Sequence, residues 1–540
     1  MNFLGFLIKL ILVIALLVGA GGYYLYAKHS VTPTPLASEN TVQGVAGLSP
    51  VEVAQVKRPT SELEIVEALR GSNGPVSIGG ARYSMGGQTA YPDSLHLDMR
   101  GFNQVVDFDP GLKQITVQSG ITWRDLQQVI DPQELSVQVM QDFSNFTVGG
   151  SLSVNAHGRY LKAGQIINSV VSFRIVLADG QVYEASPNNN SALFYGAIGG
   201  YGALGVISHV TLQLASNEPL QRSVKDLGFH DFMTYFRGNV LNDPDVVLHN
   251  AVLYPPAYES LTSVEWRRTD LPLTEERRLQ PPPEHPLLKT MAVDLLARSN
   301  LLKRLRKSLI EPYTIRKPAV VWRNWETSMD VNNYGFLSTD DETLALRMYF
   351  VPATELEIFG LKLRDVFIRH DVKVLNISIR YVPQDPGSLL AWAREDSFSF
   401  TVTYLQEKTP EALQQTREWS SELIQAAIDS DGSYYLPFQI HETSDQFAAA
   451  YPNAGRFFRL KEQADPQNRF RNMLWLEHYA GNEQDKQAFA EARRLADEAD
   501  ANSQVAQDIP PADEQPIALV AEDVGRAEAH PEIEPVKETP

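Results

Sequence analysis

Three glycine-rich segments before residue 220 constrain the fold of this chain more than any other feature. Each borders a predicted β-strand: PVSIGGARYSMGGQT (residues 75–89), NFTVGGSLSVNAHG (145–158) and GGYGALGVIS (199–208). Glycine lacks a Cβ, so backbone amides in such loops can approach a bulky anion and form a phosphate-binding nest. One such loop alone is typical of a tight turn. Together, the three predict that several loops hold a single dinucleotide.

The third segment also contains GxGxxG, formed by Gly200, Gly202 and Gly205. In a nicotinamide dinucleotide site, a helix opens directly on these glycines and points its N-terminus at the pyrophosphate. Here residues 206–214 follow, an alternating and β-branched run that predicts a strand. A turn between two strands, or a dinucleotide loop of another kind, is therefore favoured over a Rossmann unit.

The sequence around these loops predicts an α+β domain. Turn signals Asp-Pro-Gly at 109–111 and Asp-Gly at 179–180 lie between alternating apolar runs, which is typical of β-hairpins. Residues 122–130 between the hairpins predict a helix with Thr122 as its N-cap.

Composition sets the outer limits. A chain of 540 residues with 43% apolar and 21% charged residues is expected to form two or more globular domains. The absence of cysteine excludes disulfides, thiol nucleophiles and thiolate metal sites, and we expect no metal site. The net charge of −19 argues against a nucleic-acid partner.

Both ends of the chain differ from the middle. Residues 1–29 are almost entirely apolar and predict a single-pass transmembrane anchor, with a cleaved signal peptide as the alternative. The sequence does not indicate on which side of the membrane the rest of the chain lies. Residues 30–50 predict a linker. Residues 481–540 predict an acidic, largely disordered tail: from 501 onward there are nine acidic residues against two basic ones, and no aromatic residue.

A family resemblance rests on six segments that occur in a fixed order. They are IGGARYSMGGQT, LDMRGFNQVVDFD, ITVQSGITWRDLQ, FTVGGSLSVNAHG, VVSFRIVLADGQVYEAS and FYGAIGGYGALGVISHVTLQL. They resemble the FAD domain of the vanillyl-alcohol oxidase/p-cresol methylhydroxylase superfamily over about residues 50–216. The likeness is nearest to aldonolactone and alditol oxidases and to the flavin subunit of decaprenylphosphoryl-ribose epimerase.

The resemblance implies a two-domain flavoprotein with a split FAD-binding domain. We expect the FAD-binding domain over residues 51–220, a substrate cap with an antiparallel sheet and helices over 221–435, and a segment over 436–480 that returns to the first domain. Within the cap, residues 344–352 and 374–382 predict strands, and residues 353–369 and 410–427 predict helices.

The same resemblance, together with the glycine loops, implies the residues that contact FAD. They are Gly79, Gly80, Ala81, Arg82, Tyr83, Ser84, Met85, Thr147, Gly149, Gly150, Ser153, Asn155, Gly158, Gly200, Gly202, Gly205, Val206 and Ile207. Lactone and alditol oxidases of the family usually tether the flavin through a histidine in the first loop. Tyr83 stands at that position here, which implies noncovalent FAD.

Four residues are candidates for the chemistry. His157 matches a His-Gly that faces substrate in the epimerase subunit, and Arg380 resembles an arginine that alditol oxidases place near substrate and flavin. A structural hydrogen bond is the alternative for His157, and a surface ion pair is the alternative for Arg380. The lysine expected in the closing segment is not evident, so Gln439 or His441 must serve there or the chemistry differs.

Residues 288–310 form one further pattern. Leu288, Met291, Leu295, Leu302, Leu305 and Leu309 recur at helical spacing, and the segment holds six basic residues (Lys289, Arg298, Lys303, Arg304, Arg306 and Lys307) against Asp294. This predicts an interfacial helix on anionic lipid, or alternatively an ordinary helix with a solvated polar face.

These features together predict a membrane-anchored, FAD-dependent oxidoreductase that oxidises a CH–OH group of a sugar, polyol, lactone or lipid-linked sugar. Its electron acceptor would be a quinone, a protein or oxygen. The alternatives are a flavin-dependent reductase of a C=C bond in a membrane lipid and a membrane-tethered flavoprotein without turnover.

Overall fold

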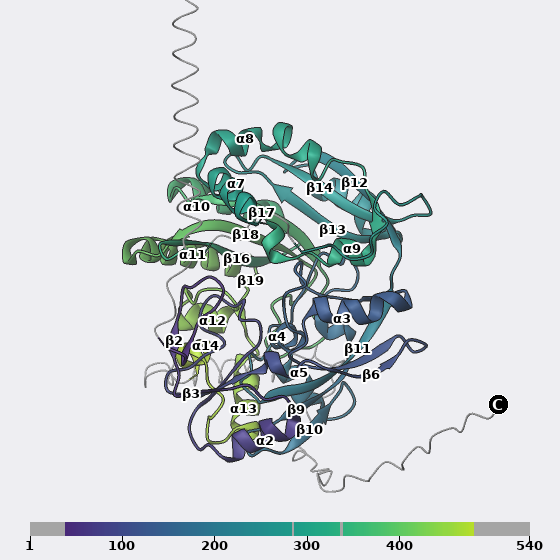
Figure 1. The fold of residues 1–540 in the computed structure, drawn as a ribbon. Coiled ribbons are helices and arrows are strands. Elements are labelled where there is room, and N and C mark those ends of the chain that lie inside the picture. Colours follow the sequence, from purple (N-terminus) through teal and green to yellow (C-terminus); the bar gives the residue numbers. More distant parts are fainter. Residues whose placement is uncertain (1–37, 283–285, 335–337, 480–540) are drawn as a thin grey trace, which may run out of the picture.

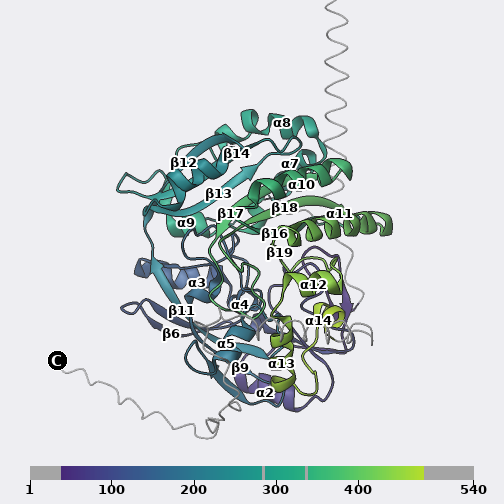
Figure 2. The same cartoon turned by 180° about the vertical axis from the view of Figure 1, so that it is seen from behind.

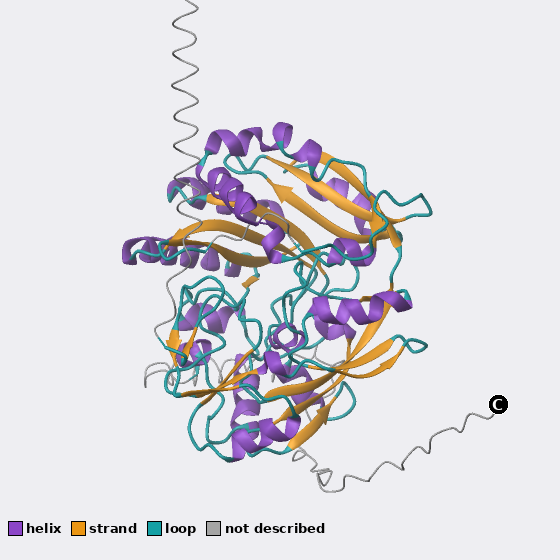
Figure 3. Ribbon diagram, in the orientation of Figure 1, coloured by secondary structure: helices purple, strands orange, loops and turns teal. Residues whose placement is uncertain are grey.

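The computed structural model describes residues 38–282, 286–334 and 338–479, and these residues form two lobes (Figure 1). The first lobe comprises residues 38–216 together with the closing segment 436–479. The cap lobe comprises residues 219–434 and carries one large sheet. Helices and strands are mixed in both lobes, as expected for an α+β protein (Figure 3).

A small parallel sheet opens the first lobe. Its strand order is β3 (Gln55–Lys57), β5 (Leu95–Asp98) and β4 (Val76–Gly79). Helix α2 (Glu62–Arg70) begins at Ser61, whose side chain accepts a hydrogen bond from the amide of Glu64. The apolar side chains of α2 pack against Val76 and Leu97 of the sheet. This packing holds the end of β4, and with it the first glycine loop, in place.

A larger antiparallel sheet forms the rest of the lobe. Its order is β10 (Val182–Ala185), β9 (Val170–Val176), β11 (Val206–Ser216), β7 (Gln114–Gln118) and β6 (Val105–Asp109), and β8 (Leu135–Val137) pairs with the end of β11. Strands β6 and β7 pair antiparallel, as do β9 and β10, which confirms both predicted hairpins. Helix α3 (Trp123–Ile130) is confirmed as well, and the side chain of Thr122 caps it.

The stretch Gly199 to Gly205 connects α5 (Ser191–Ala197) to β11. A strand follows the glycines, so the prediction that they do not open a helix is confirmed.

The cap lobe is built on an antiparallel sheet of eight strands. Their order is β15 (Val320–Trp322), β12 (Pro219–Gly228), β14 (Ser260–Arg268), β13 (Val246–Leu253), β17 (Val374–Val382), β18 (Ser397–Glu407), β16 (Glu342–Pro352) and β19 (Ser433–Tyr434). Helices α10 (Leu356–Arg369) and α11 (Pro410–Ile428) match the two predicted helices to within a few residues.

The two faces of the cap sheet have different roles. Ring contacts of Phe359 in α10 with Tyr349, and of Trp419 in α11 with Tyr404, place both helices on one face. Side chains alternate along a strand, so Met348 and Thr401 lie on the opposite face, where they line a cavity. The remaining helices of the lobe are α6 (Phe232–Phe236), α7 (Pro286–Arg298), α8 (Asn300–Leu309) and α9 (Arg323–Thr327).

The closing segment runs back along the first lobe. It contains α12 (Ser444–Ala450), α13 (Ala454–Ala464) and α14 (Met473–His478). Phe470 forms a β-bridge with Val76, and the guanidinium of Arg469 donates to the carbonyls of Leu69, Ser72 and Ala178. The end of the described chain is thereby joined to its first strands.

The predictions for the two ends have different outcomes. Residues 38–50, placed in the expected linker, belong instead to the folded lobe: β1 (Thr41–Val42) pairs with β2 (Val51–Glu52), and Val42 is buried. Among the described residues, no helix has the length and apolar character needed to cross a bilayer. The expected anchor over 1–29 and the expected tail over 481–540 lie outside the described residues.

Candidate functional site

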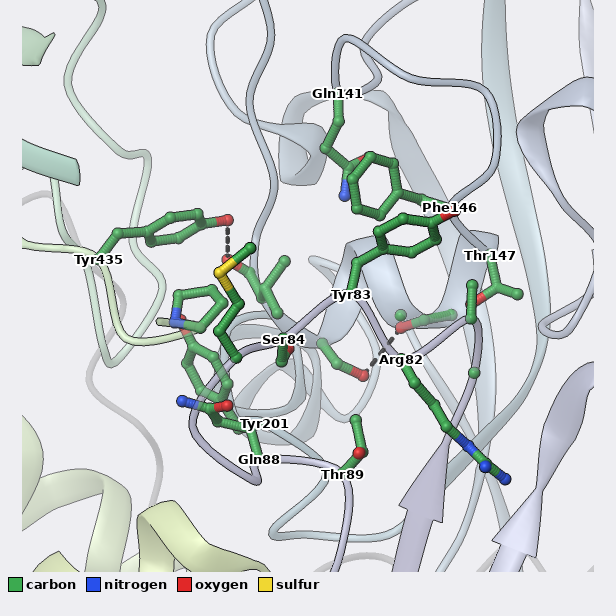
Figure 4. Close-up of a pocket in the computed structure, with 18 of the residues that line it drawn as sticks. Arg82, Tyr83, Ser84, Gln88, Thr89, Gln141, Phe146, Thr147, Tyr201 and Tyr435 are labelled. Atoms are coloured by element: carbon green, nitrogen blue, oxygen red, sulfur yellow. Dashed lines mark hydrogen bonds between the residues drawn. The ribbon is translucent and has the colours of Figure 1, made fainter. Parts of the chain in front are cut away.

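A cavity lies between the two lobes, at the ends of several predicted loops (Figure 4). Its walls come from the loop after β4, from α4 (Val148–Ser153), from the start of β11 and from the cap strands β16, β17 and β18. The three glycine-rich segments therefore meet at one place, although up to about 120 residues of sequence separate them.

The first loop offers its backbone to the cavity. The amides of Ala81, Arg82, Tyr83 and Ser84 make no hydrogen bond to any described residue, and all four residues line the cavity. Arg82 adopts a left-handed conformation with φ of 60°, which turns the chain sharply at this point. Its guanidinium pairs with Asp98 at 3.1 Å. A row of free amides is the arrangement that binds phosphate oxygens.

The second loop packs directly against the first. A Cβ on Gly80 would lie 2.2 Å from Oγ1 of Thr147, so only glycine permits this approach. The amides of Val148 and Gly149 at the start of α4 donate to the carbonyls of Ile121 and Ser119. The amide of Gly150 makes no hydrogen bond to another described residue, and Gly150 lines the cavity.

The third loop closes the far side. Gly202 has φ of +72°, a conformation that other residues rarely adopt, and a Cβ on Gly205 would lie 2.6 Å from the carbonyl oxygen of Val176. Gly202, Gly205 and Ile207 all line the cavity.

Tyr83 packs against an aromatic neighbour inside the cavity. Its ring centroid lies 4.5 Å from that of Phe146, and the two rings lie side by side in Figure 4. Burial, and then the charge of Asp330, raises the pKa of Tyr83 to about 12. Tyr83 stands where lactone and alditol oxidases usually have the histidine that tethers the flavin. It is a neutral phenol held by ring contacts.

Most of the predicted cofactor residues line the cavity: Gly80, Ala81, Arg82, Tyr83, Ser84, Met85, Thr147, Gly149, Gly150, Ser153, Gly202, Gly205 and Ile207. Five predicted residues do not line it: Gly79, Asn155, Gly158, Gly200 and Val206.

These five residues support the loops from behind. The amide of Asn155 donates to Asp385 at 2.7 Å, and Val206 packs in the apolar core beneath the parallel sheet. A Cβ on Gly158 or Gly200 would collide with a carbonyl oxygen, of Met140 or Gly196 respectively.

The predicted catalytic residues separate into two pairs. His157 and Arg380 line the cavity, whereas Gln439 and His441 do not. Gln439 accepts a hydrogen bond from the hydroxyl of Tyr404 at 3.1 Å, on the helix-covered side of the sheet. His441 is buried near Arg347, and burial followed by that charge lowers the pKa of His441. Gln439 and His441 therefore lie behind the cap strands.

His157 is enclosed on several sides. Its ring packs against those of Phe350, Trp392 and Tyr435, and Nε2 lies 3.0 Å from the sulfur of Met348. Burial, and then the charge of Arg380, lowers the pKa of His157 to about 3. The imidazole is therefore neutral near pH 7.

An ion-paired carboxylate that was not predicted from the sequence lies beside His157. Asp142 lines the cavity, pairs with Arg380 and lies 3.3 Å from Nε of Arg159. Burial raises the pKa of Asp142, but the two arginines outweigh burial and hold it below its usual value. The only available signal was its position three residues before the Asn145 that opens the second glycine segment.

The closing segment completes the wall. Pro437 and Phe438 line the cavity, and the carbonyl of Pro437 accepts a hydrogen bond from the amide of Met85. The side chain of Gln88 donates to the carbonyls of Leu436 and Phe438, both at 2.7 Å.

Comparison with protein families identifies the first lobe. Residues 53–186 match the family described as "FAD binding domain". The chain contains an FAD-binding domain. The lining residues suit FAD. Free backbone amides face the cavity, glycines allow close approaches that a Cβ would block, and the cavity is lined by residues of both lobes.

Three curated relatives are similar to part of this chain. L-gulonolactone oxidase of Mus musculus is 35% identical over 159 residues, which is 29% of this chain and 36% of the relative. Decaprenylphosphoryl-beta-D-ribose oxidase of Mycolicibacterium smegmatis is 29% identical over 167 residues, 29% of this chain and 36% of the relative. Putative D-arabinono-1,4-lactone oxidase of Neurospora crassa is 26% identical over 166 residues, 31% of this chain and 29% of the relative.

These matches support the predicted branch of flavoproteins, that of the aldonolactone oxidases. The matched part spans roughly a third of the length of each relative.

Proposed function

We propose that this chain is an FAD-dependent oxidoreductase that oxidises a CH–OH group of a sugar, polyol, lactone or lipid-linked sugar. The observation that carries the proposal is one continuous cavity. It leads from the free amides of the first glycine loop to a wall of the cap that bears charged and hydroxyl groups. Bound FAD would supply the acceptor for a hydride from the carbon that carries the hydroxyl.

The cap wall offers groups that recognise hydroxyls. Oγ1 of Thr401 is buried, lines the cavity and makes no hydrogen bond to another described residue, so a substrate hydroxyl can satisfy it. Arg380 adds donors beside it, and its pairing with Asp142 fixes the direction of its guanidinium. Leu346 and Met348 exclude water from the same wall.

His157 is the candidate proton acceptor for the substrate hydroxyl. Its ring is neutral near pH 7, so a ring nitrogen can accept a hydrogen bond from that hydroxyl, and His157 lines the same cavity as Arg380. Support for a sugar-like donor comes from the relatives, whose names specify lactone and sugar-derivative oxidases.

The test of the proposal is anaerobic reduction of the bound flavin. We expect at least one compound from a panel of aldonolactones, alditols, sugars and lipid-linked sugars to bleach the flavin absorbance. Replacement Thr401→Val should raise KM for that compound without loss of flavin. Thr403→Val, two residues along the same strand and outside the cavity lining, is the matched control and should leave KM unchanged.

Two results would contradict the proposal. Bound flavin that no donor bleaches would indicate a flavoprotein without turnover. Reoxidation of reduced flavin by an enone panel, with no response to alcohols, would indicate a C=C reductase.

A second measurement tests His157. The variant His157→Gln should keep its flavin and reduce it roughly 100-fold or more slowly, the contribution typical of a general base. His249→Gln is the matched control, because His249 is a buried histidine of the cap that does not line the cavity. An unchanged rate in His157→Gln would remove His157 from the chemistry.

A further inference from the structure

Helix α8 has its apolar and polar faces reversed relative to an ordinary surface helix. Leu301, Leu305 and Leu309 follow one another at four-residue spacing on one face, and they are 65%, 38% and 57% exposed. Lys303 is only 6% exposed. A surface helix of a globular protein normally buries its leucines and exposes its lysines.

The buried face of α8 is held by polar contacts. Nη1 of Arg306 donates to the side chain of Asn376 at 3.0 Å, and Lys307 pairs with Asp226 at 3.1 Å. These contacts fix the rotation of the helix about its axis. The outward position of the leucines is therefore specified by the basic residues on the inner face.

Helix α7 packs beside α8 and also exposes apolar side chains. Ala297 and Val293 pack against Leu344 and Leu405 of the cap sheet, which leaves Leu288 and Leu295 exposed on the outer side. Ile310 and the 82% exposed Tyr313 extend the surface beyond α8. We call these seven residues the apolar face: Leu288, Leu295, Leu301, Leu305, Leu309, Ile310 and Tyr313.

The exposed charged side chains that α7 and α8 themselves carry are all basic. Arg304 is exposed and makes no ion pair with any described residue. The only acidic residue in the two helices is Asp294, which is buried and pairs with Arg298 at 2.7 Å. A chain with a net charge of −19 thus has no exposed carboxylate on α7 or α8.

The position of the face is suited to an extended surface. In both views α8 lies at the outer end of the cap lobe, away from the first lobe (Figures 1 and 2). Contiguous exposed apolar residues of this kind mark an interaction surface. Cations beside it favour a negatively charged partner and disfavour a second copy of the same face.

We propose that the apolar face docks on the surface of an anionic lipid bilayer, with its leucines in the acyl-chain boundary and Arg304 among the headgroups. Tyr313 is suited to the same boundary, because its ring is apolar and its hydroxyl polar. The proposal is independent of the reaction at the cavity.

The absence of cysteine permits a site-specific test in the full chain. An environment-sensitive fluorophore is attached to Leu301→Cys or, as matched control, to Leu112→Cys in the turn after β6. Both positions are 65% exposed. With vesicles that contain phosphatidylglycerol, the label at 301 should shift to the blue, and brominated acyl chains should quench it. The label at 112 should not respond.

The readout is local, so attachment of the chain through any other segment does not produce the signal at 301. Adding Leu305→Glu and Leu309→Glu should abolish the response at 301, and Arg304→Gln should weaken binding of the face about fivefold. No response at 301, an equal response at 112 or an equal response to uncharged phosphatidylcholine vesicles would overturn the proposal. A blue shift without vesicles that grows with protein concentration would also overturn it and indicate self-association.

Discussion

Gly80 sets the distance between two loops of the FAD-binding domain. The first loop reaches Thr147 only because no Cβ intervenes, and the same contact places the free amides of Ala81 to Ser84 beside the start of α4. The missing side chain of Gly80 therefore shapes the site as much as the side chains that line it.

This close contact makes a rescue experiment possible. Gly80→Ala should lose bound flavin, because the new Cβ would lie 2.2 Å from Oγ1 of Thr147. Thr147→Ala in the same chain removes that oxygen and should restore part of the flavin. Gly74→Ala is the control, since a Cβ there meets no atom within 4 Å. Flavin absorbance after gel filtration measures all three variants, and full retention in Gly80→Ala would refute the close contact.

Asp142 contributes to stability through its charge. Replacement by asparagine removes the carboxylate that pairs with Arg380, while Arg159 keeps its pair with Glu326, and we expect it to lower the free energy of unfolding near pH 7 by about 2 kcal/mol. The folded pKa of Asp142 lies below its unfolded value, so this stabilisation is present above about pH 4 and is lost as the pH falls through the folded pKa.

Denaturant unfolding at several pH values checks this prediction. The difference in the free energy of unfolding between wild type and Asp142→Asn should become smaller below about pH 4. The exposed Asp107 on β6 supplies the control, Asp107→Asn, which should differ little from wild type at any pH. A difference that stays constant across the acid range would indicate that the charge of Asp142 is not responsible.

Helix α3 illustrates what the sequence specifies at the scale of an element. Thr122, the apolar spacing behind it and the turns on either side predicted both the helix and its cap, because these signals act within a few residues. Helix α8 illustrates the limit. Its spacing predicted a helix, but the buried face depends on Asn376 and Asp226, which lie 70 or more residues away.

The cap of α3 can be tested directly. Thr122→Ala removes the hydroxyl that accepts from the amide of Asp125 at 3.1 Å, and it should destabilise the protein by about 1 kcal/mol. Thr122→Ser keeps the hydroxyl and should recover most of the loss. Equal midpoints of thermal unfolding in Thr122→Ala and wild type would show that the cap does not contribute.

The whole molecule determines which predicted residues reach the cavity. Loop residues such as Gly80, Gly150 and Gly202 were predicted from the glycine pattern together with the family resemblance, and they line the cavity. Gln439 and His441 were placed by their position in the closing segment, and strand alternation and chain reversal carry both behind the cap sheet. Asp142 was not predicted because its partners are far from it in the sequence or follow no local pattern. Arg159 follows α4 and Arg380 lies on β17, and only the fold brings them to Asp142.

The mode of flavin attachment is a property of the whole site. Tyr83 stands at the position of the expected tether, His157 is the only histidine among the described lining residues, and the chain has no cysteine. Acid precipitation of the holoprotein should therefore release yellow flavin into the supernatant. Colour that remains in the washed pellet would mean a covalent bond and would contradict the prediction.

The contribution of Pro437 and Phe438 to the cavity wall has a consequence for biosynthesis. While the ribosome is still making the cap lobe, the free amides of the first loop are already synthesised, but the segment that accepts the hydrogen bonds of Met85 and Gln88 is not. Residues 436–479 must therefore be synthesised before the cofactor can be enclosed. FAD is therefore enclosed only in chains whose translation has passed both lobes.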